Sequence, residues 1–76
     1  MGRTTTADLA GPDPVDVHVG RRVRLRRRWS GLSQTALATR IEVTFQQVQK
    51  YERGANRISV SKLYRIAEAL RTPIDY

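Results

Sequence analysis

The residues best suited to specific recognition chemistry lie between Ser33 and Gly54, a stretch that predicts two short helices joined by a tight turn. The second helix, predicted over residues 44–53, carries a row of amide, cationic and aromatic side chains. Gln can hydrogen-bond adenine at two points, Lys can donate to guanine O6 or N7, and Phe can pack on a thymine methyl. A DNA major groove, about 12 Å wide, admits such a helix. The side chains predicted to read base edges are Phe45, Gln46, Gln49 and Lys50.

The start of the first of these helices is suited to holding an anion. Ser33 and Gln34 lie in this first turn, where free backbone amides and the helix dipole favour a negative group. Both residues are therefore candidates for contact with the phosphate backbone of DNA.

Composition and charge indicate a small domain that meets a polyanion. The 76 residues are enough for one domain with a modest core. The formal charge is +7, and residues 1–14 contain one arginine against two aspartates, so the positive excess lies in the rest of the chain. A compact domain this basic typically binds nucleic acid or an anionic membrane surface.

Several other classes of site are not expected. The chain has no cysteine, which excludes disulfides and thiolate metal sites, and His18 is its single histidine. No nucleophile–base pair, metal-ligand cluster or phosphate-binding loop is present, so we expect neither an enzyme nor a cofactor. No apolar run approaches the ~20 residues needed to span a bilayer, and no signal-peptide pattern appears. We therefore expect a cytoplasmic protein without a membrane partner, and as a binder of DNA it would be associated with the nucleoid.

The chain divides into an arm and one helical domain. Residues 1–12 lack periodicity and contain threonine, glycine and proline, which predicts a flexible N-terminal arm before a domain over 13–76. A first helix is predicted over 14–30, because Asp13 can cap its start and Gly31 its end. Gly20 inside that helix costs about 1 kcal/mol against alanine, so a close helix contact is expected there.

Three more helices are predicted from capping residues and apolar spacing. Ser33, Thr44 and Ser59 can cap their starts. Apolar positions at helical spacing in all four helices are expected to form the core, and the tyrosines are expected to be structural. These residues are Val15, Val19, Val23, Leu37, Ala38, Ile41, Val48, Tyr51, Val60, Leu63, Tyr64, Ile66, Ala67 and Leu70. A fifth helix could begin at Thr72–Pro73 but has too few residues for a second turn. The fold class is all-α, a compact bundle of four to five helices.

Five segments carry a resemblance to a known family: Gly31–Gln34, Ala38, Val43–Thr44, Tyr51–Gly54 and Ile66–Leu70. The stretch from Val19 to Tyr76 resembles the Cro/CI-type (phage-repressor, XRE) helix-turn-helix domain, and Phe45–Glu52 is especially like a bacterial branch of that family. The resemblance implies a lambda-repressor-like DNA-binding fold and a regulator of transcription, a repressor, that binds double-stranded DNA. It also implies a homodimer, formed in solution or only on DNA, at an inverted-repeat operator.

The resemblance also implies roles for individual residues. Members of the family often pair the arginine that matches Arg27 with the glutamate that matches Glu52, which ties the first helix to the third. Other positions of the family grip the DNA backbone on both sides of the groove. In this sequence the predicted backbone contacts are Ser33, Gln34, Thr44, Gln47, Asn56 and Arg57.

The sequence departs from the family pattern at three places. Glu42 stands in the turn position that often holds glycine, because the backbone there tends toward positive φ, and we expect a cost of roughly 1 kcal/mol. Arg71 replaces another frequent glycine after the fourth helix. The shortened fifth helix removes part of the surface on which a dimer could form.

Other interpretations of the same residues remain open. The arginine-rich run over 21–28 could make helix 14–30 a basic amphipathic module that binds RNA or an anionic membrane surface. That alternative needs the arginines on one side of an apolar stripe, whereas helical spacing spreads them around the helix. Phe45 could instead pack on a neighbouring helix. Leu25 and Trp29 are predicted at the core edge or in a partner patch.

Overall fold

The computed structural model describes residues 12–71, and this part of the chain forms four helices and no strand. The helices are α2 (Pro14–Trp29), α3 (Gln34–Ile41), α4 (Phe45–Arg53) and α5 (Val60–Leu70). The all-α prediction is therefore confirmed. The predicted arm, apart from Pro12, and the predicted fifth helix lie outside the described residues.

All four helices begin at the capping residues predicted from the sequence. In each case the side-chain oxygen accepts a hydrogen bond from a backbone N–H in the first turn. The pairs are Asp13 with Val15, Ser33 with Ala36, Thr44 with Gln47, and Ser59 with Lys62. The first helix ends one residue earlier than its predicted range, with Ser30 as its C-cap and Gly31 next at φ +75°.

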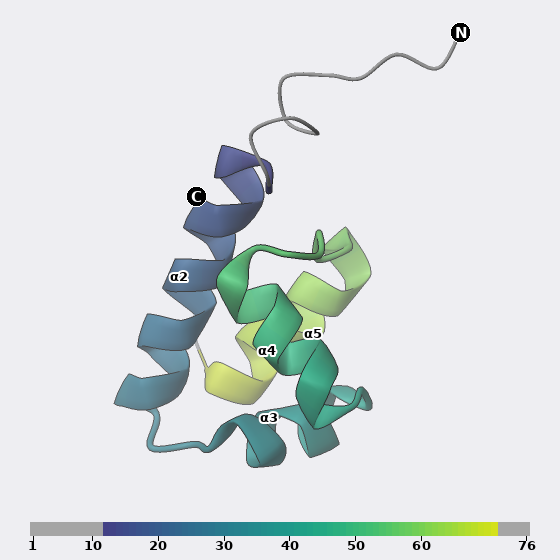
Figure 1. Cartoon of the computed structure of the whole chain (residues 1–76). Coiled ribbons are helices and arrows are strands. Elements are labelled where there is room, and N and C mark those ends of the chain that lie inside the picture. Colours follow the sequence, from purple (N-terminus) through teal and green to yellow (C-terminus); the bar gives the residue numbers. More distant parts are fainter. Residues whose placement is uncertain (1–11, 72–76) are drawn as a thin grey trace, which may run out of the picture.

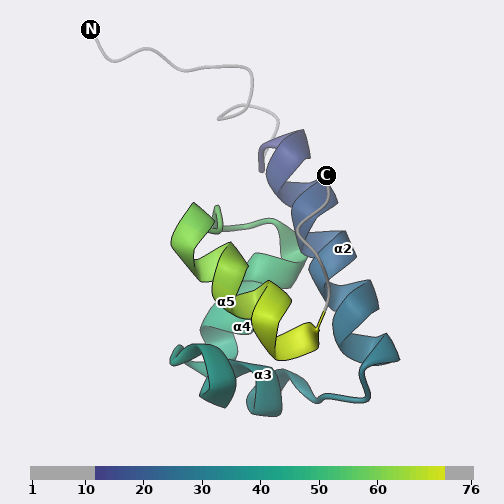
Figure 2. The same cartoon turned by 180° about the vertical axis from the view of Figure 1, so that it is seen from behind.

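The helices pack around one core with α4 and α5 on opposite sides (Figures 1 and 2). The long α2 lies along one side of the molecule, and α3 lies across the end where α2 finishes. Figure 1 shows α4 in front, and Figure 2, the view from behind, brings α5 to the front. Among the described residues, no other helix covers the face of α4 that turns away from the core.

The core contains the small and branched side chains that the helical spacing placed together. Fully buried side chains from α3, α4 and α5 meet there, with Val23 from α2. The buried apolar side chains of residues 12–71 are Val23, Leu37, Ala38, Ile41, Val48, Ile66 and Leu70. Tyr51 packs against this cluster, as predicted.

Two glycines let α2 approach α4 closely. A Cβ on Gly20 would overlap the carbonyl oxygens of Tyr51 and Glu52, so only glycine fits at this crossing. Gly54, which ends α4 at φ +74°, lies against the backbone of Val17. The predicted close contact at Gly20 is confirmed.

Three apolar or aromatic side chains predicted to be structural are exposed instead. Val15 lies on a flank of α2, to one side of the buried line through Val23. Val60 lies on a flank of α5, and Tyr64 is on the side opposite Ile66. Helical spacing predicted a stripe wider than the one that the neighbouring helices actually cover.

Candidate nucleic-acid interface

The outward face of α4 carries a line of polar side chains. Val48 and Glu52 are buried on its inner face, which fixes the rotation of the helix about its axis. Gln46 and Lys50 are exposed one turn apart on the opposite side, and Gln49 is half-buried beside them. Three of the four predicted base-reading residues thus lie together on the open face.

Phe45 lies at the start of α4 and is partly exposed. Its position three residues before Val48 places it on a flank of the helix rather than on the outermost line. The side chain is accessible enough to meet an apolar group of a partner. Its predicted contact with a thymine methyl stays a prediction.

Arg53 joins the same outward face and was missed in the sequence analysis. It is the last residue of α4 and is exposed, seven residues after Gln46 and three after Lys50. The signal was present as the i, i+4, i+7 spacing of Gln46, Lys50 and Arg53, but Arg53 is the last residue of the predicted helix and also begins a stretch, Arg53–Asn56, that is typical of a turn. It adds a cation to the line of polar side chains.

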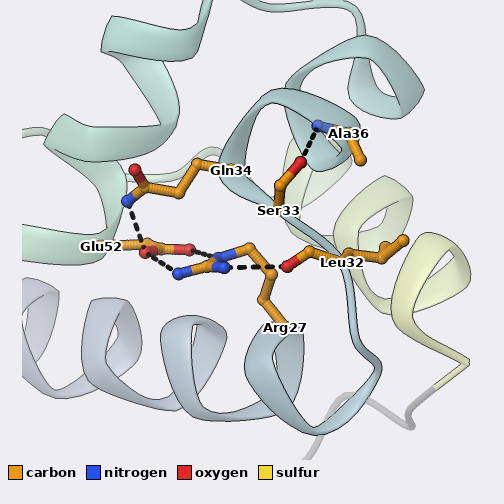
Figure 3. Close-up of polar contacts among 6 residues, drawn as sticks. All are labelled: Arg27, Leu32, Ser33, Gln34, Ala36 and Glu52. Atoms are coloured by element: carbon orange, nitrogen blue, oxygen red, sulfur yellow. Dashed lines mark hydrogen bonds and ion pairs between the residues drawn. The ribbon is translucent and has the colours of Figure 1, made fainter.

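A buried ion pair connects α2 with α4, as Figure 3 shows. Nε of Arg27 donates to Oε2 of Glu52 at 2.6 Å, and Nη2 donates to Oε1 at 3.1 Å. Nη1 of Arg27 donates to the carbonyl of Leu32 at 2.9 Å, just before α3 begins. The bidentate geometry holds the end of α4 to α2 and to the chain leading into α3.

Gln34 joins this ion pair from the first turn of α3. Its Nε2 donates to Oε1 of Glu52 at 2.9 Å (Figure 3). The side chain predicted to contact phosphate is thus part of an internal network. The backbone amides at the start of α3 remain a separate means of holding an anion, because the first N–H groups of a helix lack intrahelical partners.

The other predicted backbone contacts lie at helix starts and in the loop after α4. The hydroxyl groups of Ser33 and Thr44 accept from backbone amides, so both residues also order the helix starts beside them. Gln47 is half-buried on α4, whereas Asn56 is exposed in the loop. These four residues remain predicted, not established, phosphate contacts.

Arg57, in the same loop, is held by two carboxylates at the start of α2. Its Nε donates to both oxygens of Asp16, at 3.0 and 3.3 Å, and its Nη2 donates to Asp13 at 3.4 Å. The hydrogen bond with Asp16, followed by the charges of Asp16 and Asp13, raises the pKa of Arg57 above its usual value. No local pattern in the sequence indicates this clasp of Asp13, Asp16 and Arg57, because the partners are more than 40 positions apart.

The turn between α3 and α4 is held by α5. Glu42 ends α3 at φ 61°, as the departure from glycine predicted, and Arg71 ends α5 at φ 51°. Nζ of Lys62 donates to the carbonyl of Ile41 at 2.9 Å, which satisfies a free acceptor at the end of α3. This contact ties the end of α3 to α5.

The exposed arginines of α2 are spread around its solvent side. Arg27 is buried in the ion pair, and Arg26 lies with its Cζ 5.0 Å from the ring centroid of Trp29. The exposed arginines are Arg21, Arg22, Arg24 and Arg28. Leu25 and Trp29 are also exposed.

Within residues 12–71, no helix is long and apolar enough to cross a membrane, and no cluster of acidic and histidine side chains could hold a metal ion.

Comparison with known proteins agrees with this architecture. A helix-turn-helix family model matches residues 23–76. The chain is 66% identical over 62 residues to an uncharacterized transcriptional regulator in the ATPase CF(0) region of Rhodospirillum rubrum, covering 82% of this chain and 57% of that protein. It is 52% identical over 67 residues to the HTH-type transcriptional regulator y4aM of Sinorhizobium fredii, covering 88% and 47%. The chain thus spans about half the length of these curated relatives.

Two solved structures are also similar. The restriction-modification controller protein C.AhdI from Aeromonas hydrophila aligns with a TM-score of 0.71 and 33% identity, over 75% of this chain and 83% of that one. The clp gene regulator ClgR from C. glutamicum aligns with a TM-score of 0.79 over 86% and 83%, and at 23% identity it supports the fold alone. The chain therefore belongs to the XRE/Cro-type helix-turn-helix family of transcriptional regulators.

Proposed function

We propose that this domain binds double-stranded DNA sequence-specifically, with α4 in the major groove, and thereby regulates transcription as a repressor. The observation that carries the proposal is the outward line of Gln46, Gln49 and Lys50 on a helix whose inner face is fixed by the core. Amide and ammonium groups in that position match the donors and acceptors of adenine and guanine edges. Family membership supports the same function.

Contacts to phosphates would set the register of α4 in the groove. The start of α3 lies beside Glu52 near the C-terminal end of α4, and the loop with Asn56 and Arg57 follows that same end. Phosphate contacts position a protein on DNA without reading sequence, and base contacts then supply the choice of site. We therefore assign phosphate contacts to Ser33, Thr44, Gln47 and this loop. Base contacts are assigned to the outward line of Gln46, Gln49 and Lys50.

We further propose that two copies bind an inverted repeat. One short helix reaches only a few base pairs, which limits the specificity that one domain can achieve. Two domains on one face of DNA would place their helices in successive major grooves, about 34 Å apart. The site of action would be the nucleoid in the cytoplasm. DNA itself can bring two copies together, so the free protein need not be a dimer.

Selection from a pool of random-sequence duplexes tests the proposal. Purified protein should enrich a related set of sites, and their alignment should show two half-sites in inverted orientation. An RNA pool and vesicles rich in anionic lipid, tested at the same salt concentration, cover the alternative that α2 acts as a basic amphipathic module. Enrichment of no duplex sequence, together with binding to RNA or vesicles, would contradict sequence-specific DNA binding.

A further inference from the structure

We propose that Asp16, assisted by Asp13, is a positioning residue that holds Arg57 ready for a DNA phosphate. The inference rests on the proposed function and adds to it a role for two acidic residues. Acidic side chains beside a DNA-binding surface would ordinarily be expected to oppose binding. The geometry of the clasp points to the opposite effect.

The two carboxylates hold one edge of the guanidinium and leave another edge open. Asp16 accepts from Nε, and Asp13 accepts from Nη2. Nη1 donates to no acceptor within residues 12–71, so the Nη1 side of the fork is available. A guanidinium can therefore be held by carboxylates through one edge while it offers N–H groups to a phosphate through another.

The exposed fractions of the side chains show that Asp16 lies against the protein and that Arg57 lies toward solvent. The side chain of Arg57 is 70% exposed, whereas that of Asp16 is 15% exposed. Asp16 thus forms a fixed base in the first turn of α2, and the guanidinium lies over it toward solvent. Asp13 also caps α2, and its Oδ1 accepts from the Val15 amide at 2.7 Å, which restrains the side chain.

The affinity gained by ordering the Arg57 side chain in advance is expected to exceed the affinity lost to repulsion between the carboxylates and the phosphate. Across a guanidinium, each of the two carboxylates and a phosphate would be roughly 7 Å apart, and in water the repulsion from each weakens binding by a factor of about three. Physiological salt, with a Debye length of about 8 Å, screens this to about 1.5-fold for each carboxylate, or about twofold for both. Ordering one long side chain during binding costs about two- to tenfold in affinity. An arginine that is already ordered avoids most of that cost, so the clasp should strengthen binding at physiological salt.

A double-mutant cycle on a selected DNA site measures this coupling. Asp16→Asn keeps the shape of the side chain and should weaken binding by about threefold, and Arg57→Ala should weaken it further. In the Arg57→Ala background, Asp16→Asn should cost nothing more or should slightly strengthen binding. Glu68→Gln, which removes an exposed carboxylate near the end of α5, is the matched control and should leave affinity unchanged.

Arg57→Lys gives a second measurement with both carboxylates in place. Lysine keeps the charge but lacks the planar fork that can bond a carboxylate and a phosphate at once. We expect about threefold weaker binding with an unchanged salt dependence. In the free protein, nitrogen-15 spectra should show slowed exchange of the Arg57 Nε–H with water, and Asp16→Asn should abolish that protection.

Two results would overturn the inference while leaving the proposed function intact. One is tighter binding by Asp16→Asn in both backgrounds, which would mean that the carboxylate only repels DNA. The other is an equal loss in both backgrounds, which would mean that Asp16 acts without Arg57. Wild-type protein that binds no duplex would overturn the proposed function and, with it, this inference.

Discussion

Arg27 on α2 and Glu52 on α4 are 25 residues apart in sequence, yet Nε and Oε2 lie 2.6 Å apart inside the protein. Their side chains are 10% and 2% exposed, so the pair is almost entirely removed from water. Gln34 and the carbonyl of Leu32 take up further hydrogen bonds of the two groups. The pair thus connects the start of α3 and the end of α4 through α2. We infer that the pair fixes the position of α4 relative to α2 and α3.

Breaking this pair should destabilise the fold although it removes an acidic residue from a basic protein. Glu52→Ala leaves the Arg27 guanidinium buried without its carboxylate, which typically costs about 3–5 kcal/mol. Arg27→Ala should also lower the melting temperature strongly. Arg24→Ala, an exposed arginine on the same helix, is the control and should barely change it. Thermal melts followed by circular dichroism would contradict the prediction if Glu52→Ala melted like wild type and bound DNA more tightly.

The close crossing of α2 and α4 predicts that Gly20→Ala is destabilising. In an open helix this change would stabilise by about 1 kcal/mol. Here the added Cβ meets two backbone carbonyls, which cannot move without separating the helices, so we expect a net loss of about 1–3 kcal/mol. Chemical denaturation measures it. Gly31→Ala is a useful comparison, because nothing lies within 4 Å of its added Cβ and only the positive φ opposes the change. A more stable Gly20→Ala protein would contradict the close approach.

The turn at Glu42 predicts a substitution that stabilises the protein. A non-glycine residue at φ 61° carries a cost of about 1 kcal/mol, which Glu42→Gly removes. The change also removes the pair with Arg65, but both side chains are exposed and such pairs contribute little. We expect a gain of up to about 1 kcal/mol in the free energy of unfolding. Arg65→Ala measures the contribution of the ion pair alone, and a clear loss of stability in Glu42→Gly would show that the turn is unstrained.

Local signals in the sequence predicted much of this fold. Asp13, Ser33, Thr44 and Ser59 marked the helix starts because capping is a property of neighbouring residues. Gly20 indicated a close contact for a similarly local reason, since glycine inside a helix is otherwise unfavourable. The same periodicity that placed Val48 inward also placed the polar residues of α4 outward. The faces of the candidate site were therefore predictable from spacing.

Contacts between distant segments were not predictable in the same way. The clasp of Arg57 and the contact from Lys62 to α3 depend on how the helices dock, and no local pattern specifies docking. Val60 and Tyr64 were predicted to be structural and are exposed. Periodicity indicates which side of a helix is apolar, but it does not indicate how much of that side the neighbouring helices cover. The Arg27–Glu52 pair was expected only through the family resemblance.

Binding to DNA should weaken steeply with salt concentration. If the domain neutralises about five or six phosphates, a plot of log affinity against log salt should have a slope near −5. Arg57→Ala should make that slope shallower by about one, and Glu68→Gln should leave it unchanged. Fluorescence anisotropy between low and physiological salt measures the slopes. A flat dependence would contradict a nucleic-acid partner.

The affinities of wild-type protein, Gln46→Ala and Lys50→Ala for a selected site and for random duplex test the central claim most directly. Arg65→Ala, on α5 behind the proposed interface, is the cationic control. If α4 reads bases, each variant on α4 should lose about 1–3 kcal/mol on the selected site and much less on random duplex. Equal losses on the two DNAs would contradict base reading and assign these side chains to the DNA backbone.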